Sequence, residues 1–273
     1  MKANISITDP IVSVEWLESH RNSENLIILD GTINKVFDAA LKQIPNTRLF
    51  DIKKKFSDLS NEFPSAFPSE EQFQKEAQNL GINNNSAIVV YDDKGIYSSA
   101  RVWWLFKAFG YTNVAVLNGG FPAWLKAELP TETMTNYTGE KGDFTAKLQP
   151  DFMQFFNDVK AASKNKTHTI IDARSAGRYN CEVPEPREGL RMGTIPNSVN
   201  LPFTDLLIDG VLKPRVELEK AFYMLAEKDD AIIFSCGSGL TACVLALGAE
   251  ISGYKNLSVY DGSWTEWGSL VEA

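Results

Sequence analysis

The feature that most constrains the fold of this chain is an internal repeat. Three segments of the first half recur in the second half at offsets of 142, 144 and 143 residues: Leu26–Asp30 in Thr169–Asp172, Ala87–Tyr91 in Ala231–Ser235, and Val116–Trp124 in Val259–Trp267. Segments that recur at one spacing indicate a unit of structure that is built twice. The sequence therefore predicts two domains of the same fold.

Each repeat alternates short apolar runs, typical of buried strands, with amphipathic stretches such as residues 100–109 and 218–227. This alternation predicts an α/β fold in which each domain is a mainly parallel sheet flanked by helices. A length of 273 residues also suits two domains better than one. We place the first domain at residues 1–130, a linker rich in Thr, Gly and Lys at 131–150, and the second domain at 151–273.

The strongest candidate for chemistry is Cys236, at the end of the apolar run Ala231–Ser235. Apolar residues recur at helical spacing over residues 240–251, so the cysteine is predicted to lie on a tight loop between a strand and a helix. Gly237 and Gly239 allow the backbone of this loop to turn its N–H groups toward the sulfur. Those groups and the positive end of the helix dipole favour a thiolate, which indicates a nucleophile. The alternative is a buried structural cysteine.

The two repeats differ at this loop. After Tyr91 the first repeat continues with Asp92-Asp93-Lys94-Gly95 and has no cysteine. Since the equivalent loop cannot supply a thiolate, only the second repeat is predicted to be catalytic.

The second repeat also carries an insertion of about nine residues ahead of Ile195. Its prolines stiffen a loop that presents Arg187, and Arg178 lies just upstream. Two forked guanidiniums near a thiolate can clamp a small carboxylate. Alternatively, both arginines pair at the surface with acidic residues of the insertion, Glu182, Glu185 and Glu188. Composition alone leaves these two interpretations open.

The overall charge and the cysteine count limit the possible partners. A net charge of −8 argues against nucleic acid or an anionic membrane, so local cations would have to attract an anionic substrate. The chain begins without a long apolar region behind basic residues, and no later run is long enough to span a bilayer, so we expect a cytoplasmic protein. Cys181, Cys236 and Cys243 lack CxxC spacing, which fits a reducing compartment and no metal site. Cys243 is expected to be a core residue.

With these residues in view, the chain resembles the tandem-domain rhodanese family of sulfurtransferases over nearly its whole length. Four motifs fall in the family's order: Asp172-Ala173-Arg174, Ile195-Pro196-Asn197-Ser198, the Cys236 loop, and Asp261-Gly262-Ser263-Trp264. The loop Cys236–Ala242 looks like that of 3-mercaptopyruvate sulfurtransferases. Members that prefer thiosulfate typically have Arg and Lys where this chain has Gly237 and Ser238.

The resemblance implies an inactive first domain and a catalytic second domain that needs no cofactor. It makes Arg178 and Arg187 substrate clamps and Cys236 the nucleophile, which would take sulfur from 3-mercaptopyruvate as a persulfide. The loop amides, from Gly237 through Gly239 and Leu240 to Thr241, would hold that persulfide. Ser238 would relay the donor's proton, although the same hydroxyl can be read as a helix N-cap. The acceptor would be a thiol, cyanide or reduced thioredoxin, and we expect a monomer.

Three functions are alternatives to a 3-mercaptopyruvate sulfurtransferase. Lys53 stands where relatives of the mercaptopyruvate type have an acidic residue, and residues 57–68 contain no histidine, so thiosulfate sulfurtransferase is the first alternative. A non-catalytic sulfur carrier or interaction module is a remote one, because the cysteine loop is intact. A cysteine phosphatase would need an arginine where this chain has Ala242.

Overall fold

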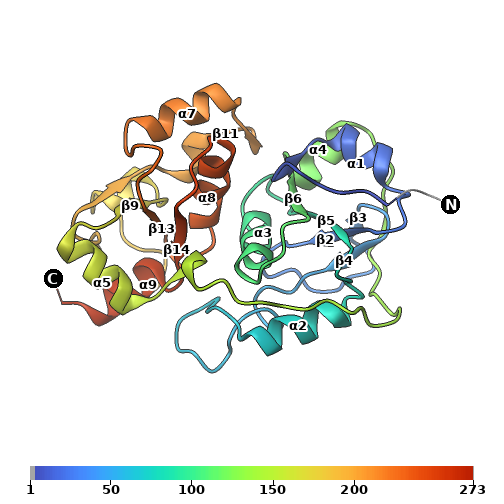
Figure 1. The fold of residues 1–273 in the computed structure, drawn as a ribbon, viewed down its shortest axis with the longest axis horizontal. Helices are drawn as coiled ribbons and strands as arrows, with labels where there is room; N and C mark the ends of the chain where they lie inside the picture. Colours follow the sequence, from blue (N-terminus) through green and yellow to red (C-terminus); the bar gives the residue numbers. More distant parts are fainter. Residues whose placement is uncertain (1–3, 273) are drawn as a thin grey trace. The chain divides into compact units, whose positions relative to one another are not determined.

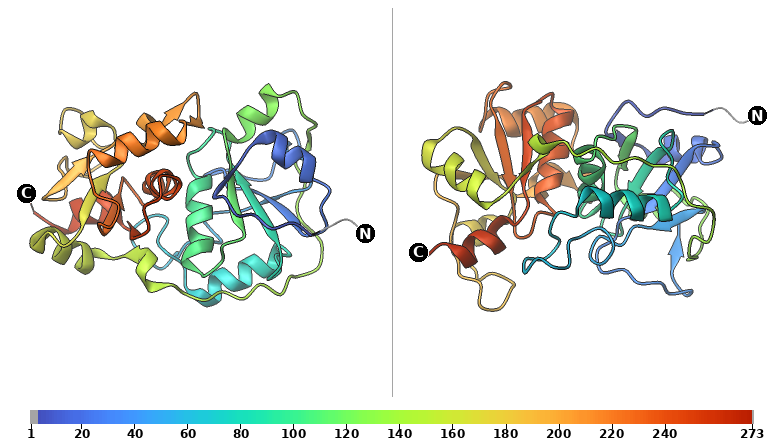
Figure 2. Two further views of the ribbon diagram at one scale, coloured as in Figure 1. Left: turned by 45° about the horizontal axis from the view of Figure 1, so that its top comes forward. Right: turned by 60° about the horizontal axis from the view of Figure 1, so that its bottom comes forward.

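The computed structural model describes residues 4–272, which form two compact units (Figure 1). The first unit comprises residues 4–58, 67–149 and 209–211, and the second comprises residues 59–66, 150–208 and 212–272. Each unit contains a five-stranded parallel sheet with helices on both faces, which can be followed in the two views of Figure 2. The predicted α/β fold, with two units of the same kind, is confirmed.

The first unit places its strands in the order β1-β6-β5-β2-β4. The antiparallel pair β3 and β7 lies outside this sheet. In chain order the elements are β1 (Ile11–Val12), α1 (Val14–His20), β2 (Leu26–Asp30), β3 (Lys42–Gln43), β4 (Thr47–Leu49), α2 (Glu70–Asn79), β5 (Ala87–Tyr91), α3 (Ser99–Ala108), β6 (Val114–Leu117), α4 (Gly120–Lys126) and β7 (Glu132–Thr133).

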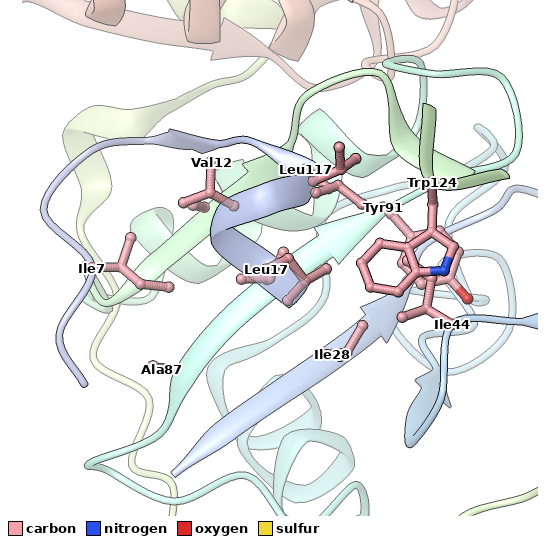
Figure 3. Close-up of a cluster of buried hydrophobic side chains, with 12 residues drawn as sticks. Ile7, Val12, Leu17, Ile28, Ile44, Ala87, Tyr91, Leu117 and Trp124 are labelled. Atoms are coloured by element: carbon pink, nitrogen blue, oxygen red, sulfur yellow. The ribbon is translucent and has the colours of Figure 1, made fainter. Parts of the chain in front are cut away.

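Strand β5 is apolar throughout because both faces of the sheet are covered. Its Tyr91 points to the face packed by α1 and α4, where Leu17 and Trp124 join one buried cluster (Figure 3). Successive side chains of a strand alternate between faces, so Val90 points the other way, toward Val102 of α3. The sheet is therefore buried between two layers of helices.

The segment expected to be a linker lies along the first unit as far as Gln149. Phe144 is fully buried against the rings of Phe73 and Phe106. The backbone N–H of Gln149 donates to the carbonyl of Ala108 at 2.7 Å. Residues 131–149, expected to be a linker, therefore pack on the first unit, and some of them belong to its core.

The second sheet has the order β10-β9-β13-β14-β8, the same topology as the first sheet with each strand in its equivalent position. In chain order the second half contains the 3-10 helix η1 (Pro150–Phe152), β8 (Met153–Gln154), α5 (Phe156–Asn165), β9 (Thr169–Asp172), α6 (Ala176–Tyr179), β10 (Ser198–Asn200), the 3-10 helix η2 (Phe203–Leu206), β11 (Leu207–Ile208), β12 (Val211–Leu212), α7 (Arg215–Tyr223), β13 (Ile232–Ser235), α8 (Ala242–Ile251), β14 (Leu257–Tyr260) and α9 (Ser263–Leu270). The internal repeat found in the sequence is therefore a repeat of topology.

Strand β13 lies at the centre of the second sheet, between β9 and β14. Ile233 packs in the cluster formed by α5 and α9, and Phe234 lies on the opposite face near Phe222 of α7. This placement explains why the run before Cys236 is continuously apolar. None of the helices within residues 4–272 is long and apolar enough to cross a membrane.

Candidate active site

Cys236 follows β13 directly, at the carboxyl end of the parallel sheet, and begins the loop that leads into α8. Side chains at this edge of a parallel sheet commonly form ligand sites. The residue is 1% exposed, and Gly239 has a φ of +73°, which lets the loop turn before the helix begins. The predicted position of Cys236 between a strand and a helix is therefore found.

The first turn of α9 makes hydrogen bonds to both N–H and C=O groups of the cysteine loop. Ser263 Oγ accepts hydrogen bonds from the backbone N–H groups of Cys236 at 3.0 Å and Gly239 at 3.1 Å. Trp264 N donates to the carbonyl of Cys236 at 3.0 Å, and Thr265 N donates to that of Gly237 at 2.9 Å. Ser263 Oγ also lies 3.8 Å from Cys236 Sγ. Three consecutive residues thus fix the backbone around the sulfur.

Ser263 has an unusual backbone conformation for this role. Its φ is +51°, in the left-handed region that disfavours residues with a Cβ, and it is fully buried. The equivalent residue of the first repeat is Gly120, with a φ of +55°. This function of Ser263 was not predicted from the sequence, although the sequence carries a signal for it, a serine where the other repeat has Gly120.

Four amides of the cysteine loop are available to a ligand. Among residues 4–272, the backbone N–H groups of Gly237, Ser238, Leu240 and Thr241 find no hydrogen-bond acceptor. Such a set of unpaired amides next to a helix start can stabilise an anion. The prediction that these amides hold an anionic sulfur requires them to be unpaired, as they are within residues 4–272.

Ser238 is half-buried in this loop, and its hydroxyl makes no hydrogen bond within the described part of the chain. The helix that follows begins at Ala242 and has Thr241 at its N-cap position. The alternative interpretation of Ser238 as the N-cap is therefore wrong, and the hydroxyl is left free for another partner.

A chain of alternating charges leads from the sheet to the cysteine loop. Asp172, at the end of β9, binds Arg174 with a shortest distance of 2.7 Å between Oδ2 and Nη2. Arg174 Nη1 donates to Glu185 Oε1 at 2.7 Å, and Arg178 Nη2 donates to Glu185 Oε2 at 2.5 Å. The Arg174 guanidinium also stacks on the ring of Trp264, 4.6 Å from its centroid. These contacts fix the base of the insertion.

Burial and pairing act in opposite directions on the ionisation of this buried pair. Burial raises the pKa of Asp172 above its usual value, and Arg174 offsets this only in part. Burial works to lower the pKa of Arg174, but Asp172 and Glu185 outweigh it and leave that pKa raised. Arg174 therefore stays charged.

Arg178 is brought to the cysteine loop. A Cβ built on Gly237 would lie 3.1 Å from Arg178 Nη2, so the missing side chain leaves the space that the guanidinium borders. Arg178 does pair with one acid of the insertion, as the alternative interpretation held, but Glu185 is buried and not at the surface. Within residues 4–272, this pair leaves Nη1 of the guanidinium without a partner.

Arg187 is placed differently. It is exposed in the loop between α6 and β10, and its side chain makes no hydrogen bond or ion pair within residues 4–272. Only its backbone carbonyl is engaged, by Leu190 N at 3.2 Å. The described contacts thus join Arg178, but not Arg187, to the cysteine loop.

The remaining cysteines lie apart from this chemistry. Cys243 is buried in α8, as predicted, with its sulfur 3.3 Å from the carbonyl oxygen of Gly239. Cys181 is exposed and has a φ of +61°. In the described residues, no group of three or more His, Cys, Asp or Glu side chains is placed to hold a metal ion.

Comparison with known proteins matches this geometry to one family. The family model for the rhodanese-like domain matches residues 13–127 and again residues 156–270. A thiosulfate/3-mercaptopyruvate sulfurtransferase of Arabidopsis thaliana is 37% identical, over 97% of this chain and 77% of the relative. A thiosulfate sulfurtransferase of Mus musculus is 36% identical, over 94% of this chain and 91% of the relative.

A solved structure agrees with the sequence comparison. The crystal structure of a 3-mercaptopyruvate sulfotransferase from Escherichia coli superposes with a TM-score of 0.82 at 33% identity, covering 94% of this chain and 99% of that one. The family model matches both repeats, and the chain therefore belongs to the rhodanese family, with two rhodanese-like domains.

Proposed function

We propose that this chain is a sulfurtransferase that takes sulfur from 3-mercaptopyruvate and passes it to a thiol acceptor through a persulfide on Cys236. The observation that carries the proposal is the loop after β13, in which Cys236 is followed by four amides that are unpaired within residues 4–272 and the guanidinium of Arg178 lies beside Gly237. A nucleophile, an anion hole and a cation for a carboxylate are thus supplied by one unit.

In the first step, the Cys236 thiolate attacks the thiol sulfur of the donor. A sulfur–sulfur bond forms, the carbon–sulfur bond breaks, and its electron pair leaves with the enolate of pyruvate. Ser238 relays the donor's thiol proton to that enolate, which becomes pyruvate. The loop amides from Gly237 to Thr241 hold the anionic outer sulfur of the persulfide.

The two arginines of the insertion bind the donor's carboxylate in this proposal. Arg178 offers the edge of its guanidinium that faces Gly237. Arg187 is exposed and unpaired within the described residues, so it is free to close on a bound anion. A forked guanidinium suits a planar carboxylate better than an ammonium does.

In the second step, an acceptor removes the outer sulfur and restores the thiolate. Thiols, cyanide and reduced thioredoxin are the acceptors that we propose. We further propose a cytoplasmic monomer whose first domain is inactive and whose second domain is catalytic. The sequence suggests residues 1–130 and 151–273 for these domains, and the segment 131–149 between them packs with the first unit. The name of the Arabidopsis relative includes a mitochondrial location, so localisation of a tagged chain is the direct check.

Intact-mass spectrometry after addition of 3-mercaptopyruvate tests the central step. Wild-type protein should gain the mass of one sulfur atom and release pyruvate. Cys236→Ser should gain none, because the hydroxyl cannot form a persulfide, whereas Cys243→Ser should behave as wild type. A sulfur adduct on Cys236→Ser would sink the assignment.

Thiosulfate sulfurtransferase is the second candidate, because the mouse relative bears that name. Thiosulfate is a dianion and gains from cations directly after the cysteine, where this chain has Gly237 and Ser238. We therefore expect higher kcat/KM with 3-mercaptopyruvate than with thiosulfate for one thiol acceptor. Equal values for the two donors would favour the second candidate.

A further inference from the structure

Glu185 is a buried carboxylate that touches two arginines. Its side chain is 1% exposed, Oε1 accepts from Arg174 Nη1 at 2.7 Å, and Oε2 accepts from Arg178 Nη2 at 2.5 Å. Burying a carboxylate costs free energy unless it is paired, and here a guanidinium lies on each side. Because Glu185 binds both arginines, the position of Arg174 restricts where the guanidinium of Arg178 can lie.

The partner on the inner side is rigid. Arg174 is 0% exposed, its Nε and Nη2 bind the carboxylate of Asp172, and Nη2 also donates to the carbonyl of Gly193 at 2.9 Å. The ring of Trp264 covers one face of this guanidinium. Glu185 is therefore anchored to a guanidinium that is held by Asp172, Gly193 and Trp264.

The second partner of Glu185, Arg178, is partly exposed, so its side chain is less restrained than that of Arg174. Arg178 is 23% exposed and comes from the short helix α6, and Glu185 takes its Nε and Nη2 donors at 3.3 and 2.5 Å. An unrestrained arginine side chain has rotamer entropy that it would lose on binding an anion. With Glu185 in place, part of that loss has already occurred before the donor arrives.

The orientation that results is specific. Nη2 and Nη1 of Arg178 are the guanidinium nitrogens nearest to the position of a Cβ on Gly237, at 3.1 and 3.9 Å. Glu185 accepts from Nε and from one hydrogen of Nη2, so the donors that remain, on Nη1 and Nη2, lie on the side of Gly237. A carboxylate bound there would approach the atoms next to Cys236.

We propose that Glu185 is a positioning residue for donor binding, which holds Arg178 with the free edge of its guanidinium toward the Cys236 loop. The proposal rests on the sulfur transfer proposed above, in which Arg178 binds the donor's carboxylate.

A double-mutant cycle in the full chain tests this role, with 3-mercaptopyruvate as donor. Glu185→Ala should lower kcat/KM on the order of 10- to 100-fold, mostly through KM, because the cation is misplaced by an ångström or more. Glu185→Gln retains an oxygen for one arginine and should lose less. In an Arg178→Ala background, the same two substitutions should change kcat/KM less than about twofold, since the group that Glu185 positions is gone.

The control is Glu188→Gln, which removes the same charge from an exposed residue of the same loop and should leave kcat/KM near the wild-type value. A merely structural function of Glu185 predicts equal losses with and without Arg178, and that result would overturn the proposal. So would wild-type KM in both Glu185 variants; Glu185→Gln decides the matter if Glu185→Ala does not fold. A wild-type chain that turned over neither 3-mercaptopyruvate nor thiosulfate would overturn the proposed function, and this inference with it.

Discussion

At the scale of single residues, Ser263 does most to shape the cysteine loop. Its hydroxyl accepts two backbone hydrogen bonds, from Cys236 and Gly239, and donates to the carbonyl of Tyr260 at 2.9 Å. The cost is a left-handed backbone that glycine would adopt more readily. The hydroxyl and the strain therefore have separable effects on stability.

Substitution of Ser263 by alanine and by glycine separates those effects. Both variants leave two buried amides without an acceptor, which should cost about 1–3 kcal/mol and slow persulfide formation. Ser263→Gly relieves the positive φ, so it should be more stable than Ser263→Ala by about 1 kcal/mol. Urea denaturation measures the free energy of unfolding, and mass spectrometry measures the rate of persulfide formation. Equal stability of the two variants would show that the backbone at this position is not strained.

The candidate site was only partly predictable from the sequence. Cys236 could be identified because a strand, a glycine-bearing loop and a helix follow one another locally. Arg178 could be named, and Glu185 was one of its three possible partners, but the burial of that pair could not be predicted because it depends on how the insertion folds back onto Arg174. The function of Ser263 depends on a tertiary contact across 27 residues, which no local pattern contains.

At the scale of elements, strands were predicted better than helix ends. The runs at Leu26–Asp30, Ala87–Tyr91 and Thr169–Asp172 are strands with those bounds. Helix α7, however, spans Arg215–Tyr223 and not residues 218–227. It begins directly after Pro214, and past Tyr223 the last turn tightens, with an i→i−3 hydrogen bond from Leu225 N to the carbonyl of Phe222 at 2.8 Å. Good helix-forming residues continue past that point, so propensity alone does not reveal the end.

The start of α3 shows why the first unit lacks a site like that of the second. Asp92 is the equivalent of Cys236, and its Oδ2 accepts from the backbone N–H groups of Tyr97, Ser98 and Ser99 at 2.8, 3.0 and 2.8 Å. A carboxylate at a helix start is favoured by the helix dipole. The amides that could hold an external anion are thus already occupied.

Asp92→Ala should destabilise the first unit by about 1.5–3 kcal/mol or more, because three amides at the start of α3 lose a charged acceptor. Asp92→Asn, which keeps one oxygen, should cost less. Thermal unfolding followed by circular dichroism measures both. Wild-type stability of Asp92→Ala would show that water replaces the carboxylate without cost.

Asp93, the next residue, provides the matched control for the Asp92 variants. The stability that its carboxyl group contributes depends on pH. Burial raises the pKa of Asp93, and Asp92 and Asp30 add to that rise. A carboxyl group with a raised pKa in the folded state contributes stability below its unfolded pKa and loses it as pH rises through the folded pKa. Asp93→Asn should therefore not destabilise at neutral pH, and its melting temperature relative to wild type should increase between pH 3 and pH 7.

At the scale of the whole molecule, the units are not two uninterrupted halves of the chain. Residues 59–66 belong to the second unit although they lie within the first repeat of the sequence. Ser65 and Ala66 are buried, and Glu62 is one of the charges felt by Glu266 in α9. The repeat pattern predicted two similar folds, but it cannot show which unit a connecting loop packs on, because that depends on tertiary contacts.

Glu62→Gln tests this assignment in the intact chain. Burial raises the pKa of Glu266, and repulsion from Asp261 and Glu62 raises it further. Removal of the Glu62 charge should therefore move the pKa of Glu266 downward, which carboxyl-carbon NMR titration can measure. Glu71→Gln, an exposed substitution in α2 of the first unit, should leave the titration of Glu266 unchanged. An unaltered titration in Glu62→Gln would place residues 59–66 away from α9.

The occupied amides of the first unit also limit how a second active site can be engineered into this chain. Asp92→Cys would supply a thiol and free the amides at the start of α3. The first repeat, however, has Gly120 in place of Ser263, so the hydroxyl that binds the backbone of the cysteine loop would be missing. Serine cannot simply be grafted at Gly120, since its Cβ would lie 2.4 Å from the carbonyl oxygen of Gly95 and 2.5 Å from that of Asp92. The loop and the helix start that supports it would have to be transplanted together, as one block.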